Sequence, residues 1–395
     1  MSKSFQTLLF SQSIANVADI FLRVILIANV FVLSGSVMAT TMVPILIGLS
    51  GFVASFLVPL VTRNWSLNRI IFYTQAGKTL LLMCLTIFLV LMTTVSVTLL
   101  YLFVVGISIL DGFASPVSHA ILPFYTKDLG KANAALSVSS ESIQLLGWGL
   151  GGLLFASLGF IPSLLITLVL FLLATVWTSR LPEVQIEKIE AETNGETLFR
   201  GWKLLWKKGR VRFLLGTNLL EILANSIWIS SILLVFVTSV LGETEVFWGY
   251  TNTAYSIGVL LGGGLILRIS DCLVRKKWQS ISYPLLLMAC VTMAVLQFPI
   301  PSLFLIANIL IGFLSQFKEI TESVLLQESV VESDLVYVYS VFEVVSTLAF
   351  TLFTYGMSWA VERFGITFVF MLSAVSLLLE ALFVIGMRNR YFQAD

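Results

Sequence analysis

Hydrophobic and polar positions divide the 395-residue chain into about a dozen apolar runs, separated mostly by connections of a few residues. A membrane-spanning helix needs about 20 predominantly apolar residues, because every backbone polar group must be bonded within the segment. The pattern predicts an all-α membrane protein with 12 transmembrane helices. We place these at about 6–33, 37–62, 70–93, 97–122, 134–157, 162–180, 211–240, 247–268, 279–298, 301–326, 336–358 and 365–387.

The composition agrees with this interpretation, since 58% of the residues are hydrophobic and 11% are charged. A globular protein carries about 25% charged residues, so no water-soluble core accommodates this excess of apolar residues. Three cysteines and one histidine lack the spacing of a disulfide framework or a metal cage. We also find no nucleophile with a base and no phosphate-binding loop. The sequence therefore predicts neither an enzyme nor a bound metal or cofactor.

The basic residues predict the orientation of the chain. Lysine and arginine avoid translocated loops, so alternate connections differ in positive charge. Of 23 basic residues, 19 lie in the termini and the even-numbered connections, three lie within spans, and only Arg363 lies elsewhere. Both termini and the central loop are therefore predicted to be cytoplasmic.

One polar segment separates six spans from six spans. We predict an N-terminal six-helix bundle over 1–180, a cytoplasmic central loop over 181–210 and a C-terminal six-helix bundle over 211–395. The loop begins acidic and becomes basic, so its second half is either an amphipathic helix on the inner leaflet or a solvated tether. Its short basic cluster does not indicate nucleic-acid recognition.

Polar residues within the spans indicate an internal repeat. Asn16 and Asp19 in span 1 are matched by Asn218 and Glu221 in span 7, 202 positions later. Transporter folds are commonly built from duplicated halves, so we expect the two bundles to be pseudo-symmetric. The same offset relates two carboxylates of spans 5 and 11, Glu141 and Glu343.

Several motifs resemble a known family. The most specific stretch runs over 115–123 and continues through the glycine-rich segment 147–152, and a second stretch covers 236–242. In these motifs the chain resembles the major facilitator superfamily, in particular the drug and siderophore exporter branch with enterobactin exporters and macrolide efflux pumps. The resemblance implies the fold of that superfamily, with transport by alternating access.

The resemblance also implies a functional setting. It is that of a monomeric, proton-coupled exporter in a bacterial cytoplasmic membrane, whose partners are protons, the lipid bilayer and a small amphiphilic or metal-chelating organic substrate. A proton-coupled importer is the nearest alternative, because nothing in the sequence determines direction. A transport-inactive scaffold or sensor with the same fold is the third interpretation.

Charged residues near the predicted cytoplasmic ends are gate candidates. The resemblance implies that the loops after spans 2 and 8 latch the inward gate, but the first of these loops carries no acidic residue. The carboxylates of spans 5 and 11 are either gate residues or simply solvated. The gate candidates are Arg63, Arg69, Glu141, Asp271, Arg275 and Glu343.

Ionisable residues inside the spans are candidates for coupling and binding, because a charge at the bilayer centre costs several kcal/mol. In span 1, Asp19 precedes Arg23 by four residues, which places both on one helix face. The two residues form either a self-satisfied ion pair or a site for substrate and protons. In span 3 we expect Lys78 to extend toward the cytoplasmic face.

Spans 7 and 10 carry further polar stripes. In span 7 no basic residue lies near Glu221, so this residue is expected to be an unpaired proton carrier, with an interhelical hydrogen bond as the alternative. In span 10, Lys318 and Glu322 are four residues apart and can pair. Glu380 of span 12 is the weakest candidate. The proton-coupling candidates are Glu221, Asp19 and Asp111, and the substrate candidates are Asn16, Asp19, Arg23, Asn218, Glu221, Asn225, Glu319 and Glu322.

Overall fold

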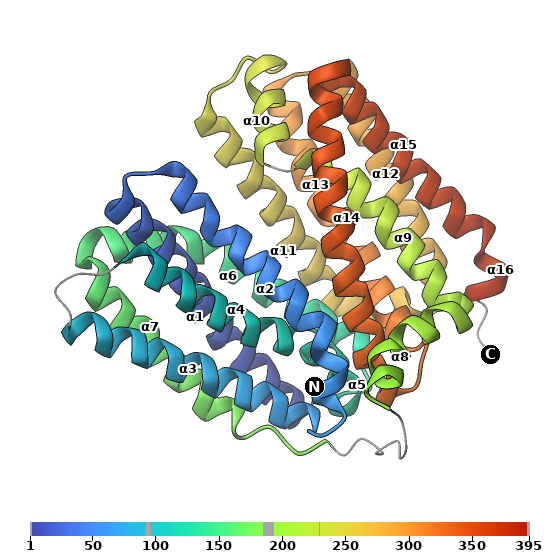
Figure 1. Cartoon of the computed structure of the whole chain (residues 1–395). Helices are drawn as coiled ribbons and strands as arrows, with labels where there is room; N and C mark the ends of the chain where they lie inside the picture. The colour runs from blue at the N-terminus through green and yellow to red at the C-terminus, as the bar shows by residue number, and fades with distance from the viewer. Residues whose placement is uncertain (1, 92–95, 185–192, 229, 393–395) are drawn as a thin grey trace. The chain divides into compact units, whose positions relative to one another are not determined.

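The computed structural model describes residues 2–91, 96–184, 193–228 and 230–392, and all regular structure within these ranges is helical (Figure 1). Long helical segments take the place of all 12 predicted spans when α9 and α10 are counted as one broken span. In the described ranges, ten helices have the length and hydropathy of a membrane span, and the α9–α10 pair makes an eleventh. The predicted fold class is confirmed.

The helices of the first half follow the predicted spans closely. The short helix α5 covers Leu122–Tyr125. The six long helices are α1 Lys3–Ser34, α2 Val37–Thr62, α3 Leu67–Leu91, α4 Val97–Ala120, α6 Leu129–Leu158 and α7 Phe160–Thr178.

The second half contains the same number of spans, the first of them interrupted. Span 7 consists of α9 Gly209–Asn225, the 3-10 turn η1 Ser226–Trp228 and α10 Ser230–Ser239. The remaining spans are α11 Glu245–Arg275, α12 Lys277–Gln297, α13 Pro301–Gln327, α14 Leu335–Phe364 and α15 Ile366–Gly386. The 3-10 turn η2 Glu332–Asp334 and the short helix α16 Arg388–Tyr391 complete the described chain.

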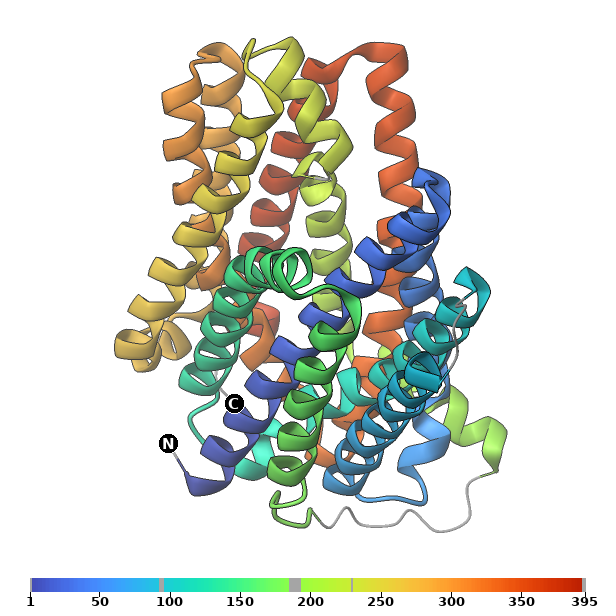
Figure 2. The same ribbon diagram turned by 90° about the vertical axis from the view of Figure 1, so that its left-hand side faces the viewer.

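The chain forms two compact units. The first consists of residues 1–127, 142–204 and 331–344, and the second of 128–141, 205–330 and 345–395. The helices α6 and α14 are each divided between the units. In the first unit α1 lies beside α7, and in the second α13 lies against both α11 and α12 (Figures 1 and 2). The division into 1–180, 181–210 and 211–395 stays a prediction.

Helix ends are determined by residues that suit them. The hydroxyls of Ser2, Ser36 and Ser96 accept a hydrogen bond from the first turn of α1, α2 and α4. Single glycines with positive φ join α6 to α7 and α14 to α15, namely Gly159 at 78° and Gly365 at 84°. These glycines occupy equivalent connections of the two halves, which adds a structural sign of the internal repeat.

Glycines also let helices approach within each unit. A Cβ on Gly258 of α11 would overlap the carbonyl oxygen of Ile309 in α13, and one on Gly147 of α6 would lie 2.8 Å from the side chain of Ile20 in α1. The resemblance implies a sliding seam between spans 5 and 8 at Gly147, Gly151, Gly258 and Gly262, with tight packing without motion as the alternative. The structure instead places these glycines in tight packing inside their own units.

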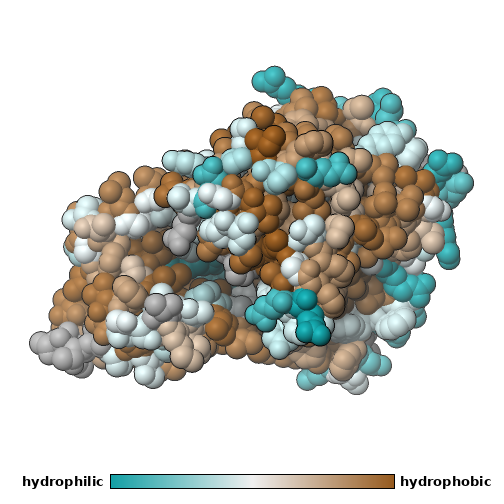
Figure 3. Space-filling view, turned by 90° about the horizontal axis from the view of Figure 1, so that it is seen from above, coloured by the Kyte–Doolittle hydropathy of each residue, from teal (hydrophilic) through white to brown (hydrophobic). Residues whose placement is uncertain are grey.

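The outer surface is strongly apolar. Figure 3 shows broad areas of apolar residues, and large side chains such as Leu102, Leu153 and Leu352 are each at least 65% exposed. In water, exposed apolar patches of this kind cause association. A lipid environment removes that cost, as the predicted membrane location requires.

Part of the predicted central loop is the helix α8, Asn194–Lys207, while 185–192 lie outside the described residues. Its buried stripe is Thr197, Gly201 and Leu205, and Arg200 forms an ion pair of 2.6 Å with Asp334. Residues 194–207 are therefore helical, and the contact of this helix with the inner leaflet stays a prediction. At its start the backbone N–H of Thr193 donates to Glu196, which lowers the pKa of that carboxyl.

We predict that Gly258→Ala lowers the stability of the second unit by about 1–3 kcal/mol, because the added methyl group overpacks the α11–α13 contact. Thermal unfolding of the purified protein in detergent measures this change. Gly264→Ala is the matched control, since a Cβ there meets nothing within 4 Å. Equal melting temperatures for the two variants would contradict the packing explanation.

Candidate functional site

The first unit contains a buried lysine held between two carboxylates, which we call the Lys78 cluster: Lys78, Asp19 and Asp111. Lys78 Nζ of α3 lies 2.8 Å from Asp19 Oδ2 of α1 and 2.9 Å from Asp111 Oδ1 of α4. The lysine side chain is only 3% exposed. Three helices that are distant in sequence therefore meet through one ammonium group.

Small residues beside the charged ones make this meeting possible. A Cβ on Gly77 would lie 2.8 Å from Leu110 Cδ1, and one on Gly112 would lie 2.7 Å from Ala54 Cβ. The two glycines precede Lys78 and follow Asp111 in the sequence. The close approach of α3 to α4 and of α4 to α2 thus occurs at the level of the cluster.

Two predictions about this region are wrong. Lys78 does not extend toward the cytoplasmic face, and the ion-pair partner of Asp19 is Lys78 rather than Arg23. The physical reason is that buried charges are stabilised by an opposite charge at hydrogen-bond distance, and Lys78 serves two acids at once. The spacing of Asp19 and Arg23 within one helix contained no information about a partner on another helix.

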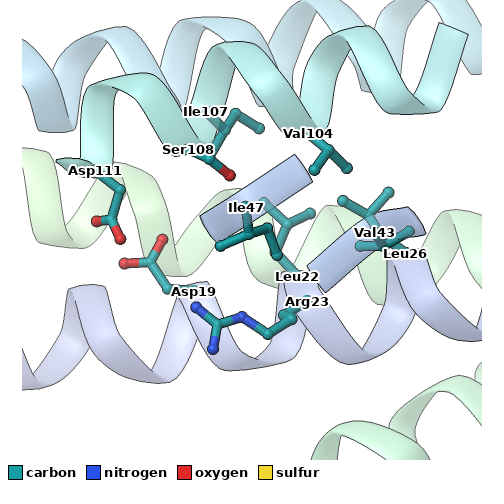
Figure 4. A pocket seen from close by; sticks show the side chains of 10 residues that line it. All are labelled: Asp19, Leu22, Arg23, Leu26, Val43, Ile47, Val104, Ile107, Ser108 and Asp111. Carbon is teal, nitrogen blue, oxygen red and sulfur yellow. The ribbon is translucent and has the colours of Figure 1, made fainter. Parts of the chain in front are cut away.

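A pocket adjoins the Lys78 cluster between α1, α2 and α4 (Figure 4). The space inside it that a water-sized molecule can occupy is about 40 Å³, so the pocket is narrow in this structure. The carboxylates of Asp19 and Asp111 face one another at one end, and Arg23 extends beside them (Figure 4). Most of the remaining wall is aliphatic, formed by Leu22, Leu26, Val43, Ile47, Val104 and Ile107, with the hydroxyl of Ser108.

The second unit contains a larger arrangement, the Lys318 cluster: Lys318, Glu221, Glu322 and Glu380. Lys318 Nζ of α13 donates to Glu221 of α9 and lies 2.9 Å from Glu322 Oε2 and 3.2 Å from Glu380 Oε1 of α15. Both Lys318 and Glu380 have no exposed side-chain surface. One ammonium group is therefore shared by three carboxyl groups.

The Lys318 cluster confirms one sequence prediction and contradicts another. The pair of Lys318 and Glu322 forms as the four-residue spacing indicates. Glu221 is not unpaired, because Lys318 reaches it from another helix. Glu380, the weakest candidate from the sequence, is completely buried in the cluster. Its position well inside the apolar span 12 was the sequence signal that pointed to a buried carboxyl group.

The charges of the Lys318 cluster do not balance if every carboxyl is ionised, because one positive charge faces three negative charges. Among the described residues, neither oxygen of Glu380 accepts a hydrogen bond of normal geometry. A buried ion without compensating partners costs several kcal/mol. The cluster therefore favours binding a proton or another cation.

Only some of the other substrate candidates lie close to these clusters. Glu319 accepts a hydrogen bond of 3.1 Å from Gln316, and Asn218 accepts one of 2.7 Å from Ser346. Arg23 lines the pocket of the first unit, whereas Asn16 is exposed and does not line it. Within the described residues, no group of three or more His, Cys, Asp and Glu side chains has the arrangement of a metal site.

Span 7 is broken next to its polar stripe. The helix α9 ends at Asn225, four residues after Glu221, and η1 continues it to Trp228. The axes of Gly209–Trp228 and Ile232–Ser239 differ by 44°. Interrupted membrane helices commonly lie at the binding sites of transporters, since their free backbone groups contact ligands. The break therefore adds the end of α9 to the candidate site.

Most gate candidates lie at helix ends, and several have partners within their own unit. Arg63 donates to Asn194 at 2.8 Å, and Arg69 forms an exposed ion pair with Glu183, so both arginines contact the segment after span 6. Glu141 accepts a hydrogen bond from Ser256. Three candidates are exposed in the structure, namely Asp271, Arg275 and Glu343.

Twelve helical spans with buried charge clusters in each unit are the features of a polytopic transport protein. Residues 76–330 match the profile of the Major Facilitator Superfamily. The chain is 31% identical over 343 residues, 84% of this chain and 82% of the relative, to the uncharacterized MFS-type transporter YjbB of Bacillus subtilis strain 168. It is 28% identical over 395 residues, 97% and 96% of the two chains, to YfmI of the same strain, described in the same words. The chain belongs to the Major Facilitator Superfamily.

Solved structures show the same fold. The Escherichia coli fucose:proton symporter FucP superposes with a TM-score of 0.75 at 13% identity, covering 97% of both chains. A bacterial homologue of the iron transporter ferroportin in an outward-facing state gives a TM-score of 0.75 at 12% identity, covering 98% of this chain and 100% of that one. At such identities the similarity establishes the architecture alone.

We predict that Lys78→Met destabilises the first unit by about 1–3 kcal/mol, because it leaves the largely buried Asp19 and the half-exposed Asp111 without their cation. Thermal unfolding in detergent measures the loss. Adding Asp19→Asn to this variant removes one of the uncompensated charges and is expected to restore part of the stability. A double variant no more stable than Lys78→Met would show that charge compensation is not the role of Lys78.

Proposed function

We propose that this protein is a proton-coupled exporter of a small amphiphilic or metal-chelating organic compound, such as a drug, a macrolide or a siderophore. It resides in a bacterial cytoplasmic membrane as a monomer with both termini in the cytoplasm. Its two halves expose a central site alternately to either side. Superfamily membership supports transport in general, and the buried charges support the coupling.

The observation that carries the proposal is the excess of carboxyl groups over buried ammonium groups. Three carboxylates share Lys318, whereas the two that share Lys78 also have Arg23 beside them. In a dry site one extra carboxylate is stabilised by a proton or by a cationic ligand. Because both compete for the same negative charge, substrate binding releases a proton, and this competition is the basis of antiport.

The chemistry of the pocket in the first unit supports an amphiphilic substrate. Aliphatic walls bind an apolar body, while Asp19, Asp111 and Arg23 at one end bind a polar group. Lys78 and Arg23 together balance the two carboxylates, so charges of both signs meet at this end and favour a zwitterionic group. This combination fits the compounds named above better than a sugar, whose hydroxyl groups require many hydrogen-bonding side chains.

Proton-coupled import is the second candidate. The same clusters couple a proton to uptake if proton and substrate bind together rather than in competition. The fucose:proton symporter of Escherichia coli shares the fold at 13% identity, so this architecture is compatible with symport. The direction of proton movement during transport separates the two candidates.

Transport by purified protein in liposomes tests the proposal. The liposomes enclose a pH-sensitive dye and receive erythromycin, ethidium or enterobactin on one side. For an exporter we expect at least one compound to move against an opposing proton flux. We predict that Glu221→Gln lowers this coupled proton flux at least 10-fold, because the glutamine cannot exchange a proton beside Lys318.

Glu362→Gln is the control, since this exposed carboxyl lies outside both clusters. Proton and substrate moving in the same direction would replace export by import. No movement of any of the three compounds, together with Glu221→Gln and Asp19→Asn leaving both binding and its pH dependence unchanged, would contradict the coupled-exporter proposal. In that case the fold without transport, as in a scaffold or sensor, becomes the better explanation.

A further inference from the structure

A groove lies where α11 and α12 meet on the outside of the second unit, over the surface of α13. The two helices are joined by the single residue Lys276. The groove has an empty volume of about 910 Å³ and is separate from the Lys318 cluster, none of whose residues lines it. The transport proposal therefore does not use this groove.

The floor and rim of the groove differ in chemistry. Leu273 and Leu314 are buried in the floor, next to Phe313 and Phe317. Leu287 on the rim is 45% exposed and continues into the apolar outer surface of α12. The groove is therefore open sideways to an apolar surrounding, which in a membrane protein is the hydrocarbon of the bilayer.

Polar groups gather at one end only. Lys276 is the single charged residue of the lining, and it is accompanied by Gln279, Ser280 and Tyr283. The adjacent Lys277 is engaged with Glu328. In the described part of the chain, no carboxylate lies within ion-pair distance of Lys276, so its ammonium group is available to an anionic ligand.

The spacing of these two ends matches a phospholipid. Lys276 and Leu287 are 11 positions apart on α12, which corresponds to about 16 Å along a helix, or about half of the hydrocarbon thickness. Trp278 beside the groove packs edge-on against Tyr283, and such aromatic residues are typical of the membrane–water interface. Lys276 is thus at headgroup level when the floor is at acyl-chain level.

We propose that this groove binds one anionic phospholipid. The phosphate of the headgroup contacts Lys276, with the hydroxyl of Ser280 and the amide of Gln279 as hydrogen-bond donors. One acyl chain covers the floor between Phe313 and Leu287. Because no carboxylate balances the positive charge of Lys276, the groove binds an anionic lipid more tightly than a zwitterionic one.

Native mass spectrometry of the full chain, with phosphatidylglycerol or phosphatidylcholine added to delipidated protein in detergent, tests this site. We expect tighter binding of phosphatidylglycerol. Lys276→Gln is expected to weaken that binding about 5-fold and to leave phosphatidylcholine unchanged, whereas Lys276→Arg retains it. Lys208→Gln is the matched control, because Lys208 is an exposed basic residue outside the groove.

A second variant tests the apolar part. Leu287→Trp fills the groove from its exposed rim and is expected to reduce the binding of both lipids, and thermal unfolding verifies that the variant is folded. Equal affinity for the two lipids, or phosphatidylglycerol affinity unaffected by Lys276→Gln, would overturn the proposal. Equal competition by soluble glycerol phosphate would also overturn it, since the site then binds a free anion rather than a lipid.

Discussion

The sharing of one buried ammonium group among several carboxyl groups is the interaction on which the rest of this structure depends. In the first unit Lys78 connects α1, α3 and α4, and in the second Lys318 connects α9, α13 and α15. Buried charges are tolerated in a bilayer only when they are paired or face a polar cavity. Each cluster therefore joins three helices of its unit, and the surplus of carboxyl groups around Lys318 is the basis of the proposed proton coupling.

Close helix packing and charge pairing depend on one another in both units. Gly77 and Gly112 flank the charged residues of the Lys78 cluster and allow α3 to approach α4 and α4 to approach α2. In the second unit Gly258, Gly262 and Gly312 bring the backbones of α11 and α13 together on the helix that carries Lys318. Polar contacts between membrane helices contribute only about 1 kcal/mol each, so this packing supplies much of the stability that holds the charges in place.

The sequence predicted the fold far better than the site, for a physical reason. Apolar length and the distribution of basic residues are properties of single segments, and the observed helix ends lie within a few residues of most predicted ones. The charge pairs join different helices instead. Only the pair of Lys318 and Glu322, which lies within one helix, followed from spacing. The roles of Lys78 and Glu380 depend on neighbours 33 or more positions away, which periodicity does not reveal.

Infrared spectroscopy of the purified protein in lipid measures directly whether the clusters hold protons, because protonated carboxyl groups absorb at frequencies distinct from carboxylates. At neutral pH we expect a carboxylic-acid band that shifts in heavy water and loses intensity in Glu380→Gln or Glu221→Gln. Addition of a transported compound is expected to reduce the same band as the proton leaves. A spectrum without this band at neutral pH, or a band unaffected by both substitutions, would contradict the view that these carboxyl groups exchange protons with a substrate.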